Sequence, residues 1–181
     1  AGGNNVQPGQ REIQHRLYKN DGKGNFAIDV TSFPSNNMNI SVAANYDYDG
    51  DGDEDLYIGS RSVPYSYGVS PQSYVYNNDG QGHFTDVTQK LNPELAEKGM
   101  ITGACWTDIT GEGQRELVIT GEWMAPVIYG YNKRANKLEE IKATGLEGLN
   151  GWWQTVNAGD INGDGKMDLV LGNIGENFYL R

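Results

Sequence analysis

Cysteine and histidine are scarce in this chain, which has one of the first and two of the second among its 181 residues. A single cysteine excludes a disulfide bond within the chain, and we expect Cys105 to be a small buried thiol in a strand. Lysine and arginine total 14 against 24 aspartates and glutamates, which gives a formal net charge of −10. Without a basic stripe to neutralise phosphates, nucleic acid is not an expected partner. No apolar run approaches the length of a membrane span.

Motifs for nucleophilic catalysis and phosphate binding are missing as well, because the chain has neither G-x-S-x-G nor a P-loop. The histidines, His15 and His83, lie in loop-like and hairpin-like segments and are not expected to be catalytic. Glu122 beside Trp123 could be a carboxylic acid with a raised pKa. The carboxylates that could complete a hydrolytic pair with it are Glu139 and Glu140. We favour a polar residue at a sheet edge next to a core aromatic, and we expect no enzymatic activity.

Acidic residues are abundant and gather in two segments, 47–55 and 160–168, of the form D-x-[DN]-x-D-G-x-x-D. Carboxylates packed this closely repel each other by about 4 kcal/mol per pair at roughly 4 Å and an effective dielectric near 20. A divalent cation turns that repulsion into a binding site, and ligands that are all oxygen favour Ca²⁺ over zinc or copper. The predicted ligands are the side chains of Asp47, Asp49, Asp51 and Asp55 with the carbonyl of Asp53, and those of Asp160, Asn162, Asp164 and Asp168 with the carbonyl of Lys166.

An EF-hand loop also opens D-x-D-x-D-G, but it needs a bidentate glutamate at its twelfth position. Here the twelfth residues are Ile58 and Leu171, which cannot bind a metal, and strand-like tails follow in place of a helix. The segments are therefore interpreted as calcium-binding β-turns, in which Gly52 and Gly165 permit the positive φ of a sharp turn. The alternative is a pair of acidic turns that are merely solvated.

Two further patterns repeat along the chain. Asn-Asp-Gly occurs between apolar runs in segments 17–26 and 75–84, which predicts β-hairpins, although these acids could also be taken for more calcium ligands. Segment 108–116 is a decayed copy of the acidic turns, with Thr110 in place of an acid, the longer Glu112 and Glu116, and the added charge of Arg115. We expect it to keep the turn and to bind metal weakly or not at all.

The acidic turns recur at intervals of about 50–60 residues, and four short antiparallel strands per repeat are typical of a β-propeller blade. The strands predicted for the best-preserved repeat are 41–45, 56–59, 73–76 and 83–87, and segment 92–99 predicts one or two helical turns. The fold class is thus all-β, a single propeller segment of about three four-stranded blades. Its predicted divisions are a partial blade 1–38, blades 39–91 and 100–145, and a partial blade 152–181.

The two ends of the chain are interpreted as incomplete blades, with 1–4 closing a second strand and 177–181 beginning a third. Exposed sheet edges are unfavourable, because their unpaired backbone N–H and C=O groups can pair with other chains. We therefore expect the remaining blades of a longer chain, or another protein chain, to cover them.

These residues resemble the FG-GAP/VCBS repeat family, most closely propellers of the ASPIC/UnbV type related to cartilage acidic protein, and the turns are similar to those of integrin α-subunits. The resemblance rests on the two acidic turns, the Asn-Asp-Gly hairpins and segments 121–124 and 151–153, and the chain departs from the pattern at 108–116. It implies a calcium-stabilised propeller that is exported and often belongs to a large surface protein. Some related propellers are polysaccharide lyases.

We therefore expect a non-catalytic, calcium-binding module that acts as a scaffold for a protein or glycan ligand. Weak calcium turns suit extracellular fluid, so the expected location is extracellular, on the cell surface or periplasmic. The alternative is part of a polysaccharide-active enzyme that uses calcium to engage acidic glycans. The 11 tyrosines and four tryptophans could form a sugar-stacking platform or pack between blades; the segments concerned are 152–153 and 65–74.

Overall fold

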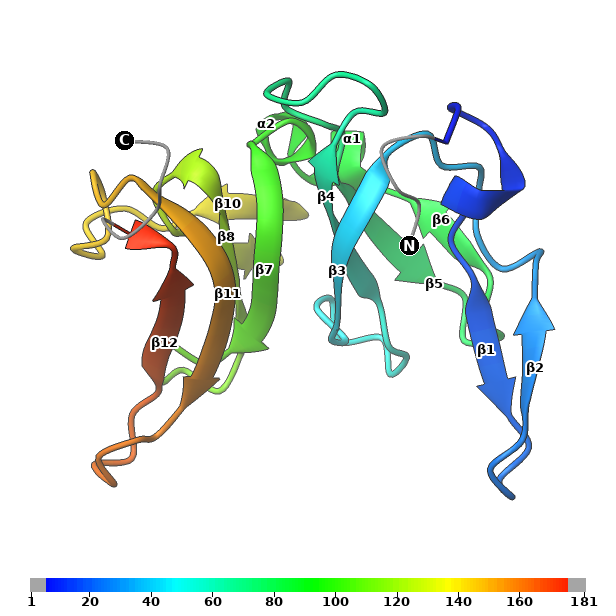
Figure 1. The fold of residues 1–181 in the computed structure, drawn as a ribbon. Helices are drawn as coiled ribbons and strands as arrows, with labels where there is room; N and C mark the ends of the chain where they lie inside the picture. Colours follow the sequence, from blue (N-terminus) through cyan, green and yellow to red (C-terminus); the bar gives the residue numbers. More distant parts are fainter. Residues whose placement is uncertain (1–5, 176–181) are drawn as a thin grey trace.

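The computed structural model describes residues 6–175 and consists of β-strands with little helix (Figure 1). The strands are β1 (Leu17–Asn20), β2 (Phe26–Asp29), β3 (Asn39–Asn45), β4 (Leu56–Ser62), β5 (Tyr74–Asn78), β6 (Phe84–Asp86), β7 (Met100–Thr107), β8 (Glu116–Met124), β9 (Val127–Asn132), β10 (Lys137–Glu140), β11 (Gly151–Gly159) and β12 (Asp168–Asn173). The predicted strand ends at 1–4 and 177–181 lie outside the described residues. The all-β prediction is confirmed.

Every pairing between these strands is antiparallel. β3, β4, β5 and β6 form one sheet in that order, and all four strands predicted for this repeat are present, with β3 and β4 longer than expected. A second sheet has the order β10-β9-β8-β11-β12, with β7 also paired to β8, and β1 and β2 form a separate hairpin. β11 joins β8 only at Gly151 and Trp152, where the register shifts. Blade number, blade boundaries and closure stay predictions.

The first strands of successive repeats, β3, β7 and β11, lie beside one another (Figure 1). Because these strands run in the same direction, the turns β3–β4, β7–β8 and β11–β12 emerge at one end of the sheets, and α1, α2 and the loop after β4 lie at the other. A fold of this kind places all three acidic segments on the same side of the molecule.

The main core lies between the β3–β6 sheet and the β7–β10 strands. Its largest buried side chains include Tyr57, Leu117 and Tyr129, which are at most 1% exposed. Gly59 allows a close approach here, since a Cβ at this position would lie 2.6 Å from Cγ2 of Ile101 and 2.7 Å from Cγ1 of Val42. Strand burial between the sheets therefore fixes how the repeats sit against each other.

Two four-residue helices follow β6: α1 (Thr88–Leu91) and α2 (Pro93–Ala96). The predicted helix corresponds to α2, which Asn92 caps by accepting hydrogen bonds from the backbone N–H groups of Glu94 (2.9 Å) and Leu95 (3.2 Å). α1 was not predicted from the sequence. Within residues 6–175, no helix is long and apolar enough to cross a membrane.

Candidate metal centre

The first acidic turn, residues 47–55, connects β3 to β4 and is organised around Asp47. Its Oδ1 accepts hydrogen bonds from the backbone N–H groups of Gly50 (2.8 Å) and Asp51 (3.1 Å), and its Oδ2 accepts one from Gly52 (3.0 Å). Gly50 and Gly52 have φ angles of 79° and 101°, which other side chains would disfavour. The residues Asp47, Gly50 and Gly52 therefore give this turn its shape through local hydrogen bonds.

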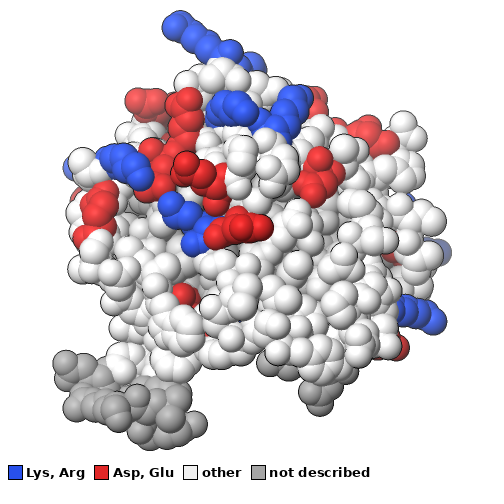
Figure 2. Space-filling view, turned by 90° about the horizontal axis from the view of Figure 1, so that it is seen from above, with Lys and Arg blue, Asp and Glu red and all other residues white. Residues whose placement is uncertain are grey.

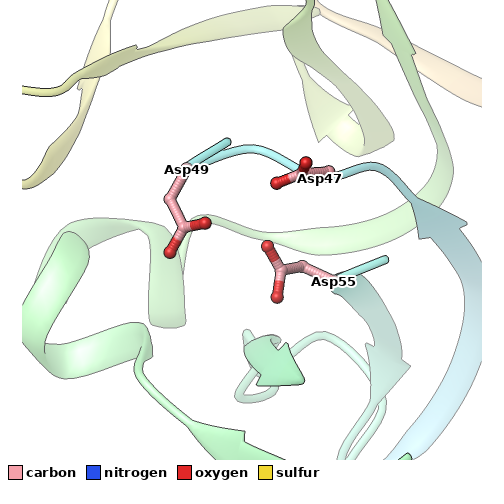
Figure 3. Close-up of side chains that lie close together, drawn as sticks. All are labelled: Asp47, Asp49 and Asp55. Carbon is pink, nitrogen blue, oxygen red and sulfur yellow. The ribbon is translucent and has the colours of Figure 1, made fainter. Parts of the chain in front are cut away.

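Three carboxylates converge at this turn, those of Asp47, Asp49 and Asp55 (Figure 3). One oxygen atom of each lies within 4.8 Å of the others. Oxygen ligands at 2.3–2.6 Å from one Ca²⁺ are at most about 5 Å apart, so this spacing fits a shared calcium ion. Asp55 approaches from the start of β4, which means that the site links the turn to the sheet.

Asp55 is the most buried of the three carboxylates. The residue is 1% exposed, and its Oδ1 accepts hydrogen bonds from the backbone N–H of Asn78 (2.9 Å) and the side-chain amide of Asn77 (3.0 Å). Its Oδ2 is buried without a hydrogen-bond partner. Burial raises the pKa of Asp55 to about 6, and loss of hydration followed by the charge of Asp51 raises the pKa of Asp49. A cation beside Oδ2 would relieve both effects.

The other predicted residues of this turn lie outside the group of three. Oδ1 of Asp51 accepts a hydrogen bond from the backbone N–H of Asp53 (3.2 Å). The carboxylate of Asp53 lies next to the β5–β6 hairpin, since a Cβ on Gly80 would be 3.3 Å from its Oδ2. The predicted side-chain role of Asp51 and carbonyl role of Asp53 therefore stay predictions.

The second acidic turn, residues 160–168, repeats the same local scaffold between β11 and β12. Oδ1 of Asp160 accepts hydrogen bonds from the N–H groups of Gly163 (2.7 Å) and Asp164 (3.1 Å), and its Oδ2 accepts one from Gly165 (2.9 Å). This turn is more exposed than the first acidic turn. Oδ2 of Asp168 accepts a hydrogen bond from the backbone N–H of Ile161 (3.0 Å).

The remaining predicted ligands of the second turn bond to their own neighbours. Oδ1 of Asn162 accepts from the N–H of Asp164 (2.8 Å), and Oδ1 of Asp164 accepts from the N–H of Lys166 (2.9 Å). Within the described residues, the cluster at Asp47 is the one in which three acidic groups meet within 4.8 Å. Asn162 replaces one acid here, so the second turn has fewer charged oxygens to bring together.

The decayed turn, residues 108–116, keeps the expected shape and satisfies its own carboxylates. Asp108 accepts hydrogen bonds from Gly111 (2.7 Å), Glu112 (3.1 Å) and Gly113 (2.9 Å), as the first aspartate does in the other turns. The buried Glu116 accepts hydrogen bonds from the N–H of Ile109 (2.8 Å) and the hydroxyl of Thr110 (3.1 Å). The carboxylate of Glu116 thus has backbone donors, as Oδ2 of Asp168 does in the second turn, in contrast to Oδ2 of Asp55.

The Asn-Asp-Gly segments form the predicted hairpins. In the second hairpin Oδ1 of Asp79 accepts hydrogen bonds from the N–H groups of Gln81 (2.8 Å) and His83 (3.1 Å). The same segment also supplies Asn77 and Asn78, which hold Asp55, a role that the sequence analysis missed. The sequence signal for this role is the pair Asn77-Asn78, which stands directly before the turn of the hairpin that follows the acidic segment 47–55.

The interpretation of Glu122 as a polar residue at a sheet edge next to a core aromatic is wrong, because Glu122 lies opposite Met100 of β7 and Trp152 of β11 on the inner strand β8. Glu122 is buried at 2% exposure, but Trp123 is not a core aromatic, because its side chain is 58% exposed and its φ is 62°. Residues 116–122 of β8 are all buried, and exposure begins at Trp123, where the backbone adopts a positive φ. The other two carboxylates considered for a hydrolytic pair have their own partners: Glu139 with Asn132 and Glu140 with Lys98 and Lys142.

His15 is a buried residue that the sequence analysis treated as an ordinary loop position. It is 7% exposed and packs edge-on against the rings of Phe33, Tyr74 and Tyr76 at centroid distances of 5.4–5.7 Å. Burial lowers its pKa to about 4. The imidazole is therefore neutral and acts as part of the aromatic packing between β1–β2 and β5.

These observations define an antiparallel all-β repeat protein in which aspartate-led acidic turns lie at one end of the sheets. The sequence profile of the FG-GAP-like repeat family matches residues 47–119 and 108–171, which together span more than half of the chain. The chain belongs to this family. Both matched segments begin at the first aspartate of an acidic turn, Asp47 and Asp108. No curated protein matches the chain.

Proposed function

We propose that this chain is a calcium-binding β-propeller module without catalytic activity, exported from the cytoplasm and related to the ASPIC/UnbV type. The single observation that carries the proposal is the convergence of the Asp47, Asp49 and Asp55 carboxylates around a buried residue, Asp55, whose Oδ2 has no hydrogen-bond partner. Aspartates alone supply this set, and hard oxygen ligands suit Ca²⁺. The bound ion stabilises the fold because it binds the native turn and not the unfolded chain.

The acidic turns are the proposed ligand sites, with Asp160, Asn162, Asp164 and Asp168 forming a second, weaker one. An affinity of about 10⁻⁴–10⁻³ M is expected for sites of this exposed kind. Such affinities are useful where calcium is plentiful, which is why we place the protein outside the cytoplasm, on the cell surface or in the periplasm.

A scaffold role is supported by apolar side chains that remain exposed at both outer strand pairs. On the β1–β2 side these are Tyr18, Phe26, Ile28 and Val30, and on the β12 side they are Met167 and Val170, each at least 44% exposed. Among the described strands β2 pairs only with β1, and β12 only with β11. We propose that further blades, of a longer chain or of another protein chain, cover these edges.

The calcium proposal is tested by thermal unfolding and by titration calorimetry. In EDTA the melting temperature is expected to be lower than in millimolar CaCl₂, and the calorimetric titration is expected to report binding with the weak affinity given above. MgCl₂ at the same concentration is the control, because Mg²⁺ requires a smaller, regular octahedral site. Equal melting temperatures in EDTA and calcium would refute the structural role of the ion.

A further inference from the structure

Two aromatic segments of the sequence, 121–124 and 151–153, meet at the end of the sheets opposite the acidic turns. Trp152 of β11 pairs with Glu122 of β8, and the rings of Trp152 and Trp123 lie 6.2 Å apart between centroids. Tyr67, from the loop between β4 and β5, packs edge-on against Trp123 at 5.7 Å. Three segments that are far apart in the sequence therefore place their rings together.

This end of the molecule carries charge unevenly. Figure 2 shows that the charged side chains gather on one side, while much of the remaining surface is free of them. The exposed large apolar side chains contributed by the loop after β4, β8 and the loop before β11 are Tyr65, Tyr67, Val69, Trp123 and Leu149, at 48–59% exposure. Two of them, Tyr67 and Trp123, have their rings in contact and form an exposed aromatic surface.

Trp123 is held outward by its backbone. Its φ of 62° lies in the left-handed region, which is unfavourable for a bulky residue and is found most often at functional sites. Gly68 of the β4–β5 loop lies against the indole, since a Cβ at Gly68 would be 3.5 Å from Cζ3 of the ring. The indole is therefore exposed and at the same time held in place by a neighbouring loop.

A charged pair lies directly beneath these rings. The side chain of Glu122 is 0% exposed, and its Oε1 accepts hydrogen bonds from Nε (2.9 Å) and Nη2 (2.6 Å) of Arg61. The hydroxyl of Tyr67 donates to the other carboxylate oxygen. The Arg61 side chain is 48% exposed, so a fixed guanidinium borders the aromatic surface.

We propose that Trp123, Tyr67 and the Arg61–Glu122 pair form a binding site for a neutral glycan. An exposed indole offers an apolar face to the C–H side of a sugar ring, and rigid charged hydrogen-bonding groups at its border suit sugar hydroxyls. The charges of Arg61 and Glu122 balance, and the chain has a net charge of −10, which repels polyanions. Trp, Tyr and Arg are also enriched at protein interfaces, so failure of every hexasaccharide to bind would favour a protein partner instead.

The site rests on the proposed function, because it names the ligand class of that binding module. The test is titration of the whole chain, in calcium and in EDTA, with cellohexaose, xylohexaose, mannohexaose and laminarihexaose, and with the acidic hexagalacturonate. Calorimetry and tryptophan fluorescence are the readouts. At least one neutral hexasaccharide is expected to bind and to change the fluorescence.

Three variants locate the site. Trp123→Gly removes the indole and relieves the backbone, so it is expected to fold with an unchanged or higher melting temperature and to bind the hexasaccharide at least about tenfold more weakly, a loss of about 1.4 kcal/mol. Trp123→Phe keeps an aromatic face and is expected to retain part of the affinity. Tyr18→Ala is the matched control, since Tyr18 is 52% exposed on β1, and it should bind like the unmodified chain.

Absence of binding to every neutral hexasaccharide, binding of hexagalacturonate alone, or full affinity in Trp123→Gly would overturn the glycan site. The calcium proposal is judged separately, by the difference in melting temperature between calcium and EDTA. Binding of a hexasaccharide without a calcium-dependent change in melting temperature would support the glycan site and refute the metal site. A calcium-dependent melting temperature without hexasaccharide binding would support only the metal site.

Discussion

Replacing Asp55 by asparagine is expected to stabilise the chain without calcium and to have little net effect on stability in calcium. The carboxylate is 1% exposed and its Oδ1 is hydrogen-bonded to β5, while its Oδ2 has no partner. Asparagine keeps an oxygen acceptor in the position of Oδ1 and places an uncharged NH₂ donor in the position of Oδ2. The substitution therefore removes a poorly solvated charge without creating a cavity.

The size of the effect follows from the pKa of Asp55. Its rise from 3.8 to about 6 means that ionisation at pH 7 costs the folded protein about 3 kcal/mol relative to the unfolded chain. In EDTA, Asp55→Asn should raise the free energy of unfolding by up to this amount. In calcium the unmodified chain gains about 2.7 kcal/mol at a concentration one hundred times Kd. The variant should lose the gain from this site, so the two chains should be about equally stable in calcium.

The assay is urea unfolding at pH 7, followed by circular dichroism, in EDTA and in CaCl₂. Glu116→Gln is the matched control, because Glu116 occupies the same position of the decayed turn and its carboxylate is hydrogen-bonded to Ile109 and Thr110. That variant should be destabilised equally in both buffers. If Asp55→Asn were also destabilised equally in EDTA and in CaCl₂, the inference that a cation binds beside Asp55 would be wrong.

Three other substitutions test the packing that positions the site. His15→Gln should flatten the pH dependence of stability. The pKa of His15 is about 4 in the folded protein and 6.5 in the unfolded chain, so about 3 kcal/mol of stability is present above pH 6.5 and is lost as the pH falls to 4. An unchanged dependence of the melting temperature on pH would contradict this. Asn92→Ala should cost about 1–2 kcal/mol in urea unfolding, because it removes the cap of α2; a loss below 0.3 kcal/mol, roughly the error of the method, would contradict it. Gly59→Ala should cost about 1–3 kcal/mol, since its Cβ would overlap Ile101 and Val42, and wild-type stability would show that the two sheets can move apart.

Much of the fold could be predicted from the sequence because its signals are local. An aspartate followed by glycines at fixed spacing shapes each acidic turn through hydrogen bonds to its own backbone, as Asp47 and Asp160 do. The Asn-Asp-Gly hairpins and the Asn92 cap are equally local. Alternating and apolar runs predicted strands near their observed positions, and the ends were missed by a few residues because pairing partners decide where a strand stops.

Local patterns set the decayed turn 108–116 apart but could not distinguish the two full acidic turns, 47–55 and 160–168, from each other. Both turn sequences predict the same shape, but only the tertiary structure shows that Oδ2 of Asp55 is buried beside β5 without a hydrogen-bond partner, whereas Oδ2 of Asp168 accepts from a backbone N–H. The exposure of Trp123 was likewise misjudged, because it depends on backbone dihedrals and on a loop from another repeat. Short-range hydrogen bonding is encoded in neighbouring residues, while burial and the meeting of distant segments arise only when the repeats pack together.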